Sequence, residues 1–546
     1  MDLSQGGGLI DCPVLFIDFQ STGAVPPKAH LIEMGWSYSQ NINDEAPIFS
    51  SFVKLPETHT LPPRISQLTG ISETDLVEAP DKEVLWRQVW EHVPSATPLI
   101  IHFAQFERPF LKELCQELPH IFCTFEIARR LFPEIPSRSL RAISGHLGHS
   151  VQELKRSHDH IAATRYIWRY VAERLSKEHG IRDFEALNRW LDANPVKLKN
   201  TRKKSYLLPA HVRLSLPDEP GIYKFKNLRG EILYVGKASS LKSRVNSYFR
   251  GQKTKGARLN ELTSQIASVA VATVQSPLEA ALLESDAIKT FNPPYNRALK
   301  KEARDVAFWN DEFSMQKSGR LLGPFSSPSF VELVATLRLL VENSGEGGME
   351  GVDTSTLKEA IKVFRARYFP SSCAWRRLLV RLWGESIERA RALRKLGDEE
   401  VEDEEDEEEA LDESLTPEDI AERIKSTFTA FAHRVHRGRF LIRLANCQLY
   451  WQSRGSQVWH SAIVKNGLAE FKLAKHARAG TFAKHSKDPP EIFNVATYDR
   501  LQVLTTEIRR LIKESNKVLL FFPHGRKLDE FGIAKFMFPG AFDETN

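Results

Sequence analysis

Short apolar runs alternate with longer stretches of helical periodicity over the first 185 residues. The runs at 14–19, 30–35 and 99–103 have the length and composition of buried strands. Apolar side chains recur at helical spacing in five further segments, at 82–92, 106–117, 124–131, 139–147 and 158–176. Strands that alternate with helices predict an α/β domain in which helices cover a sheet.

A different pattern follows near the middle of the chain. Two short apolar runs, 221–225 and 232–235, flank a polar, turn-rich connection, which is typical of a β-hairpin. Helical periodicity takes over at 241–248, and either Ser239 or Ser240 can cap that helix. The sequence therefore predicts a compact strand–strand–helix unit.

Three polar residues of this unit are spaced so that they share one side of it. Lys237, Arg244 and Tyr248 lie at i, i+7 and i+11. Two cations and a phenol on one face suit a phosphate group. A surface helix with scattered basic residues accounts for the same spacing, so the spacing alone leaves both interpretations open.

The pattern beyond residue 300 predicts a helical region followed by a small α+β domain. Helices are expected at 330–343, 356–364, 375–395, 420–435 and 498–514. Strands are expected at 439–444, 447–451, 458–464 and 518–522.

Length and charge add two constraints. A chain of 546 residues is too long for a single core and is expected to hold about three domains. The segment 398–413 contains 13 Asp or Glu and no Lys or Arg, so the net charge of +5 becomes +18 when this segment is left aside. Such a basic remainder suits a nucleic-acid binder. The acidic segment is either a solvated insertion or a mimic of DNA that restrains the basic surface.

Cysteine usage and hydropathy indicate the compartment. The five cysteines are dispersed and form no CxxC pair, as expected in a reducing cytoplasm. The start of the chain is polar and glycine-rich, unlike a signal peptide, and no apolar run has membrane-spanning length. We expect a cytoplasmic protein that has no membrane partner and is nucleoid-associated when bound to DNA.

These patterns divide the chain into seven segments. We expect a disordered tail, an α/β domain, a basic linker, a small α/β domain, a helical region, an acidic disordered insertion and a terminal α+β domain of unknown role. Their respective bounds are 1–11, 12–185, 186–212, 213–300, 301–396, 397–416 and 417–546.

Residues 213–300 resemble the GIY-YIG nuclease family, most closely the amino-terminal domain of the UvrC and Cho excision-repair endonucleases. Gly221-Ile222-Tyr223 matches the first signature, and Tyr234-Val235-Gly236 matches the second with Val in place of Ile. The other motif residues of the family match Lys237, Arg244, Tyr248, Glu284 and Asn296.

The resemblance implies hydrolysis of a phosphodiester with one Mg²⁺ or Mn²⁺ ion. Glu284, on a helix that Ser276-Pro277 opens, would hold the ion. An ion pair with Arg244 is the alternative role of Glu284, and the two roles are compatible. Arg244 would stabilise the charge that develops on phosphorus.

The remaining motif residues are implied to act on water and phosphate. Tyr223, together with Lys237 or Tyr234, would orient or deprotonate the attacking water. Tyr248 and Asn296 would position the phosphate and the adjoining loop. Five nearby cations extend the expected DNA track, although each alone is compatible with a solvated surface charge: Lys253, Lys255, Arg258, Lys300 and Lys301.

Residues 12–180 resemble the DEDDh 3′–5′ exonucleases, which have an RNase H-like fold and include the DNA polymerase III epsilon subunit. The match rests on Asp18-Phe-Gln-Ser-Thr-Gly, Leu68-Thr-Gly-Ile, His102-Phe-Ala-Gln-Phe-Glu, Arg130-Leu-Phe-Pro and His158-Asp-His-Ile-Ala-Ala. The chain as a whole thus resembles a bacterial fusion of an exonuclease domain with a UvrC/Cho-type endonuclease domain.

The exonuclease resemblance is incomplete at the metal ligands. The family has carboxylates at positions that match Asp18, Gln20, Glu107 and Ala163, where they bind two metal ions. Only two carboxylates remain, and Asp159, one turn before Ala163, is the one candidate replacement. The general-base histidine matches His158; a register shifted to His160 would place Arg165 at the acidic position.

Three functions fit these observations. The first is a DNA repair endonuclease with an active GIY-YIG centre and a catalytically impaired exonuclease-like domain that binds DNA. The second is a bifunctional exonuclease and endonuclease, against which Gln20 and Ala163 argue. The third is a non-catalytic DNA-binding scaffold, against which the complete GIY-YIG set argues. DNA is the expected partner and other excision-repair proteins are possible partners; the sequence leaves the oligomeric state open.

Overall fold

The computed structural model describes residues 8–150, 154–193, 204–250, 256–296, 306–310, 322–343, 354–369, 375–394, 416–452, 458–474, 477, 493–514, 517–523 and 525–537. Two compact units divide the chain. One is Met1–Ala280 with Phe291–Lys300, and the other is Ala281–Thr290 with Lys301–Asn546. Among the described helices, none combines the length and the apolar character needed to cross a membrane.

A five-stranded sheet of order β3-β2-β1-β4-β5 forms the first domain. The strands β1 (Val14–Ser21), β2 (Leu31–Ser39) and β3 (Phe49–Phe52) are antiparallel neighbours. The strands β4 (Leu99–Ile101) and β5 (Ile121–Cys123) continue the sheet in parallel from β1. This mixed topology is the expected RNase H-like fold.

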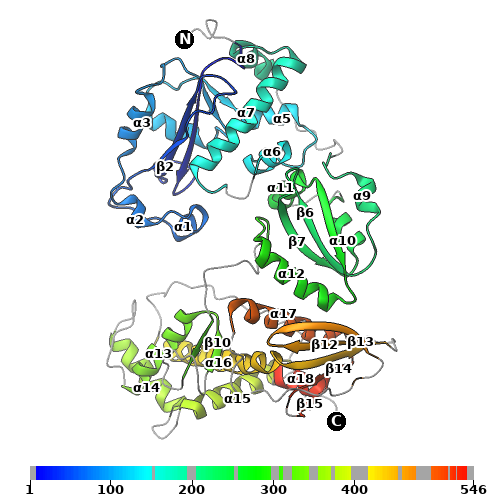
Figure 1. The fold of residues 1–546 in the computed structure, drawn as a ribbon. Coiled ribbons are helices and arrows are strands. Elements are labelled where there is room, and N and C mark those ends of the chain that lie inside the picture. The colour runs from blue at the N-terminus through cyan, green and yellow to red at the C-terminus, as the bar shows by residue number, and fades with distance from the viewer. Residues whose placement is uncertain are drawn as a thin grey trace. The chain divides into compact units, whose positions relative to one another are not determined.

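Helices cover both faces of this sheet, because β1 is apolar on both sides. Val14 and Phe16 belong to one buried cluster, whereas Leu15 and Ile17 belong to another. The longest described helix of this domain, α7 (Ser157–His179), packs on β1 and β2 (Figure 1). The other helices are α1 (Pro63–Thr69), α2 (Glu73–Leu76), α3 (Lys82–Trp90), α4 (Glu107–Leu114), α5 (Thr124–Leu131), α6 (Leu140–Leu147) and α8 (Phe184–Ala193). All five helices predicted from the periodicity are confirmed.

The first domain extends beyond its predicted bounds of 12–185. Leu9, assigned to a disordered tail, is fully buried in the core, and its N–H donates to the carbonyl of Arg182. Helix α8 adds Phe184 and Leu187 to the same core. Leu9 was missed because a single buried leucine gives no periodic signal, and α8 was missed because a ten-residue helix beside a basic linker is shorter than the window over which periodicity is read.

The small middle domain is built on a three-stranded antiparallel sheet of order β7-β6-β8. The predicted hairpin is confirmed as β6 (Gly221–Lys226) and β7 (Ile232–Ala238), and β8 (Ser268–Thr273) joins β6 on its other side. Ser240 caps the predicted helix by accepting a hydrogen bond from the N–H of Ser243. The helices are α9 (Ala210–Leu214), α10 (Leu241–Ser247), α11 (Ala257–Gln265) and α12 (Pro277–Phe291).

Two motif glycines make the packing of this sheet possible. A Cβ on Gly221 would lie 2.2 Å from the carbonyl oxygen of Ala272 on the paired strand β8. A Cβ on Gly236 would lie 2.3 Å from the hydroxyl of Tyr223, which faces Gly236 across the hairpin. Glycine is required at both positions because another side chain would displace a strand or the tyrosine.

The second unit contains a helical cluster and a second sheet. The helices α13 (Pro328–Glu342), α14 (Thr354–Tyr368) and α15 (Trp375–Arg394) pack with α16 (Pro417–Leu444) and the two-stranded sheet of β9 (Ala307–Trp309) and β10 (Leu322–Phe325). An antiparallel sheet of order β13-β12-β11-β14-β15 follows. Its elements are β11 (Cys447–Gln452), β12 (Trp459–Lys465), β13 (Leu468–Ala474), α17 (Val495–Lys513), β14 (Lys517–Phe521), β15 (Lys527–Leu528) and α18 (Glu530–Met537).

One predicted strand is wrong. Residues 439–444 form the end of α16, because Phe440, Leu441 and Leu444 are buried at helical spacing. The other predicted helices and strands of this region are confirmed. The acidic segment 397–415 lies outside the described residues.

The close contact of Gly236 with Tyr223 predicts the effect of adding a methyl group. We expect Gly236→Ala to lower the free energy of unfolding of the middle domain by about 2 kcal/mol, because the buried phenol has no room to move aside. Native-state hydrogen exchange of the β6 and β7 amides measures this loss. Gly256→Ala is the control, since a Cβ there meets open space; equal effects of the two changes would contradict the packing argument.

Candidate active site

Four of the predicted site residues form one cluster at the end of the β6–β7 hairpin. The hydroxyls of Tyr223 and Tyr248 lie 2.7 Å apart within hydrogen-bond distance. The ring of Tyr234 lies 6.1 Å from each of their rings. The guanidinium of Arg244, one turn before Tyr248 on α10, lies 5.5 Å from the Tyr248 ring. The structure thus joins two strands and a helix into one polar aromatic site.

The electrostatics of the cluster fix the protonation state of Tyr223. Burial raises the pKa of Tyr223 well above its ordinary value, and the neighbouring Tyr248 and Tyr234 raise it further. A hydrogen bond with Arg244 opposes this rise without reversing it. A phenol that keeps its proton orients a water molecule by hydrogen bonding.

Asn296 is bound to the edge of the same hairpin. Its Oδ1 accepts from the N–H of Val235 at 3.0 Å, and its Nδ2 donates to the carbonyl of Val235 at 2.9 Å. Val235 lies between Tyr234 and Gly236 on β7, which is the edge strand of the sheet. The amide of Asn296 therefore replaces a neighbouring strand and fixes the second signature in place.

Two further predicted residues, Lys237 and Glu284, lie on β7 and α12. Lys237 is half-buried near the end of β7. Glu284 lies on α12, within the stretch Ala281–Thr290 that belongs to the second unit. In that unit the same stretch is bonded to α17, where Arg500 pairs with Asp286 at 2.8 Å and Asp499 pairs with Lys289 at 3.0 Å.

Of the five cations expected along a DNA track, the structure describes one. Arg258 lies 5.4 Å from the ring of Tyr295 and donates to the carbonyl of Pro294 at 3.2 Å. These contacts give Arg258 a packing role within the domain. The other four expected cations, Lys253, Lys255, Lys300 and Lys301, lie outside the described residues.

A second polar cluster occupies the sheet of the first domain. Gln20 donates from Nε2 to Oδ2 of Asp18 at 3.1 Å, and His160 donates from Nδ1 to Oδ1 of the same carboxylate at 3.1 Å. Burial alone would lower the pKa of His160, but Asp18 outweighs it and the pKa is raised. Both oxygens of Asp18 are thus engaged by side chains of the protein.

His158 and Ala163 are not part of this cluster, which corrects the predicted register. The side chain of His158 is 55% exposed and lies 3.7 Å from Asp159, whereas Ala163 is fully buried in an apolar cluster. His160 faces Asp18 because it lies one helical turn from the buried Ser157 and Thr164 on the inner face of α7. The predicted register avoided a cation at the acidic position, whereas the burial pattern of α7 turns His160 and not His158 toward Asp18.

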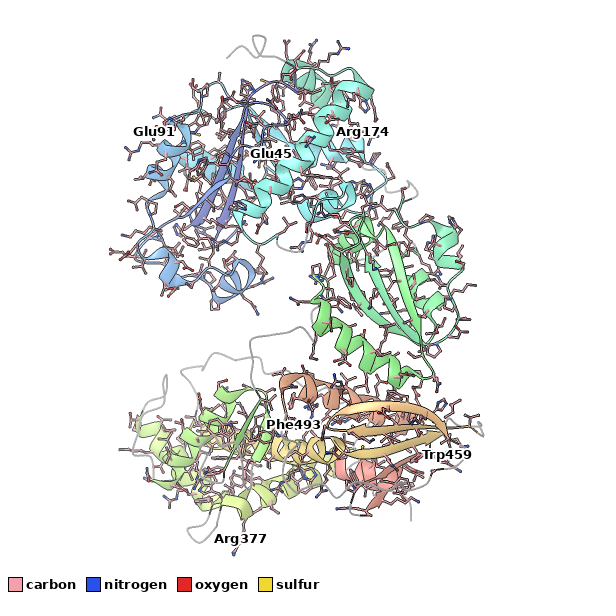
Figure 2. The ribbon with its side chains drawn as sticks, viewed as in Figure 1. Glu45, Glu91, Arg174, Arg377, Trp459 and Phe493 are labelled. Atoms are coloured by element: carbon pink, nitrogen blue, oxygen red, sulfur yellow. The ribbon has the colours of Figure 1, made fainter. Side chains whose placement is uncertain are left out.

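In the register set by His160, Arg165 takes the place of the last acidic residue. Its guanidinium donates to the backbone carbonyls of Asp44 and Ala46, in the loop before β3. Burial lowers the pKa of Arg165, whereas the charge of Glu45 acts to raise it. Glu45 lies in the same loop and is labelled in Figure 2. A cation therefore occupies this position of α7, with its guanidinium bonded to the loop before β3.

Two buried residues complete the surroundings of Asp18. Glu107 is only 3% exposed; burial and the nearby Asp18 raise its pKa well above the ordinary value. One of its oxygens, Oε2, has no hydrogen-bond partner among the described residues. Burial lowers the pKa of His102 to about 3, so this imidazole is neutral, and it bonds to Thr124 and to the carbonyl of Arg138.

Family models match both regions of the chain. Residues 15–164 match the Exonuclease model, and residues 219–297 match the model of the UvrC-like GIY-YIG domain. The range 15–164 lies in the domain that carries Asp18. The range 219–297 contains all four residues of the polar aromatic cluster, Tyr223, Tyr234, Arg244 and Tyr248.

Curated relatives cover the chain only in part. A Mycobacterium tuberculosis protein, whose name describes an inferred bifunctional exonuclease/endonuclease, is 28% identical over 344 residues, which are 59% of this chain and 51% of that protein. UvrABC system protein C of Methanospirillum hungatei is 42% identical over 125 residues, which are 21% of this chain and 24% of that protein. The chain thus spans about half of the first relative and about a quarter of the second.

Solved structures match two parts of the chain. The GIY-YIG domain of UvrC from Thermotoga maritima, solved with magnesium, is 30% identical; the match covers 16% of this chain and 100% of that domain, with a TM-score of 0.15. A 3′-exonuclease that recognises a histone mRNA stem-loop is 16% identical over 31% of this chain and 68% of its own, with a TM-score of 0.27. On the family models and the topology together, the chain joins an exonuclease-family domain of RNase H-like fold to a UvrC-like GIY-YIG domain.

Proposed function

We propose that this protein is a DNA endonuclease of excision-repair type that cuts a phosphodiester at the GIY-YIG cluster. The observation that carries the proposal is the direct contact of the Tyr223 and Tyr248 hydroxyls beside Arg244. Arg244 is exposed while the two phenols are buried, so a phosphate can reach the guanidinium from solvent with the hydroxyls fixed behind it. The basic composition outside residues 398–413 suits a DNA substrate.

The residues present fit one hydrated Mg²⁺ or Mn²⁺ ion. Among the residues that the structure describes, no group of three or more His, Cys, Asp or Glu is arranged to hold a metal. A single carboxylate from Glu284 suits magnesium, which keeps several waters and completes its shell with substrate phosphate oxygens. When bound, such an ion stabilises the negative charge on the leaving oxygen.

The protein residues then have separate roles in the proposed reaction. Tyr223, protonated and immobile, orients the attacking water together with Tyr234 or Lys237. Arg244 stabilises the charge on the phosphoryl oxygens, and Tyr248 holds Tyr223 in place through the hydroxyl contact.

In the same proposal, the exonuclease-like domain binds DNA without cutting it. Four carboxylates would balance two metal ions, but Gln20 and Arg165 stand at two of those positions and His160 engages Asp18. Phe103, beside this centre, is 45% exposed at φ +66°, a backbone conformation that bulky residues rarely adopt. Its ring packs edge-on against Phe125 and offers an open face to a nucleobase.

The inferred double activity in the name of the Mycobacterium tuberculosis relative favours a second candidate, an enzyme that is both exonuclease and endonuclease. Asp18, Glu107 and His160 are the residues on which such an exonuclease would depend. The two candidates differ in one measurable property, the release of nucleotides from a 3′ end.

Substitutions of Arg244 and Glu284 test the endonuclease centre. We expect Arg244→Ala and Glu284→Ala each to slow magnesium-dependent nicking by about 100-fold or more, with DNA affinity changed less than about threefold. Nicking of a supercoiled plasmid measures the rate, and EDTA should abolish it.

Matched controls exist for both substitutions. Arg229→Ala removes an exposed arginine of the β6–β7 turn, and Glu279→Ala removes a carboxylate from the first turn of α12. Both should cut as the wild type does. Wild-type rates in Arg244→Ala and Glu284→Ala would place the endonuclease site elsewhere, and no cutting by the wild type would favour a binding scaffold.

The second prediction concerns the exonuclease-like domain. We expect full-length protein with Glu284→Ala to leave a 5′-labelled single strand intact in Mg²⁺ or Mn²⁺, and the further change Asp18→Ala to make no difference. Denaturing gel electrophoresis would show any ladder of shortened strands. A ladder that Asp18→Ala removes would establish the bifunctional enzyme instead.

A further inference from the structure

The exonuclease-like domain and the GIY-YIG domain meet through α6 and α11, which belong to the same compact unit (Figure 1). Glu261 of α11 is the central residue of this contact. Its carboxylate accepts from the hydroxyl of Ser139 at 2.6 Å and lies 3.9 Å from the guanidinium of Arg141. Both partners come from the exonuclease-like domain.

Backbone contacts reinforce the same junction. The hydroxyl of Ser264 accepts from the N–H of Ser137 at 2.9 Å, and His146 donates from Nδ1 to the carbonyl of Ser264 at 2.8 Å. Gly145 leaves room for Gln265, because a Cβ there would lie 2.1 Å from the Gln265 amide oxygen. The glycine on α6 therefore allows the close approach of α11.

On its other side Glu261 holds a buried tyrosine of the GIY-YIG domain. Tyr295 donates from its hydroxyl to Glu261 Oε1 at 2.8 Å, and Gln265 Nε2 donates to the same hydroxyl at 2.6 Å. Burial and the Glu261 charge raise the pKa of Tyr295, so its hydroxyl keeps the proton that it donates. Tyr295 is 5% exposed, and its side chain is thus fixed by the junction between the domains.

Tyr295 is adjacent in sequence to the residue that fixes the second signature. The N–H of Tyr295 donates to the carbonyl of Leu233, and Asn296 bonds both backbone groups of Val235. Residues 295–296 therefore cover the open edge of β7 over the stretch that carries Tyr234 and leads to Lys237. Hydrogen bonds connect Ser139 to Glu261 and Glu261 to Tyr295, the peptide bond joins Tyr295 to Asn296, and hydrogen bonds connect Asn296 to this strand.

We propose that the exonuclease-like domain supports the endonuclease centre, and that Glu261 and Tyr295 are positioning residues that hold β7 in its cutting geometry. The inference rests on the proposed endonuclease function and gives the first domain a role that does not require its own catalysis. Each interaction in the series is a buried or half-buried hydrogen bond, and a charged acceptor strengthens two of them. Loss of one bond is expected to loosen the edge of β7 without unfolding the sheet.

The test uses the full-length protein with Tyr295→Phe, which removes the hydroxyl and keeps the ring. We expect kcat for nicking to fall about tenfold with KM for DNA unchanged, since Tyr295 touches neither the expected phosphate site nor the expected metal ligand. Hydrogen exchange at the Val235 amide should quicken about tenfold, because its acceptor on Asn296 is less firmly held.

Tyr166→Phe is the matched control. Its hydroxyl also donates to a backbone carbonyl, that of Leu147, in the same unit, but it has no bond to Asn296 or β7. Both the rate and the Val235 exchange should stay within about twofold of the wild type. Unchanged Val235 exchange in Tyr295→Phe would overturn the proposal.

A milder variant and a double variant keep the test decisive if Tyr295→Phe folds poorly. Glu261→Gln keeps the shape and removes the charge, and it should slow nicking about threefold and quicken Val235 exchange. The double variant should equal Tyr295→Phe alone, because both residues act through one series of bonds. If the two substitutions slow nicking by factors that multiply in the double variant, the two residues do not act through one series of bonds. Hydrogen exchange at the Val235 amide does not depend on catalysis. It therefore tests whether Glu261 and Tyr295 hold β7 even if the wild type proves not to cut DNA.

Discussion

Tyr223 is fully buried between two strands and a helix, and the geometry of the GIY-YIG site depends on this one placement. Its phenol fits only because Gly236 leaves the facing position of β7 empty, and its hydroxyl is held by Tyr248 and by a hydrogen bond with Arg244. The same burial raises its pKa and keeps the proton on the oxygen. Packing, hydrogen bonding and the chemistry available to the site thus follow from a single constraint.

The two centres of the chain use charge in opposite ways. In the GIY-YIG cluster a cation, Arg244, stands exposed beside neutral phenols, which leaves it available to a phosphate. Around Asp18, by contrast, His160 and Gln20 engage both oxygens of this carboxylate, while the buried Oε2 of nearby Glu107 has no hydrogen-bond partner among the described residues. A carboxylate that is already satisfied gains less from binding a metal ion, which is the physical basis for proposing a binding role there.

The segment that covers the edge of β7 connects the GIY-YIG domain to the exonuclease-like domain. An edge strand presents unpaired backbone groups, and here the side chain of Asn296 satisfies those of Val235. Tyr295, next in the chain, is bonded through Glu261 to the exonuclease-like domain. The segment that completes the sheet of one domain is therefore held by the other.

The sequence by itself predicted the long helices and the central hairpin, and its resemblance to the GIY-YIG family supplied the set of candidate residues, because periodicity and signatures are local properties. It missed β8 and α11 and placed a strand at 439–444, where α16 continues. It predicted the hairpin at 221–238 and the helix that Ser276-Pro277 opens, but it left the cap of the helix at 241–248 open between Ser239 and Ser240, and the structure selects Ser240. Only the tertiary structure decided which side chains meet. His160 rather than His158 reaches Asp18, since two residues along a helix turn the side chain by about 200°. No sequence signal singles out Glu261, and its contacts with Ser139 and Tyr295 appear only when α6 and α11 are brought together.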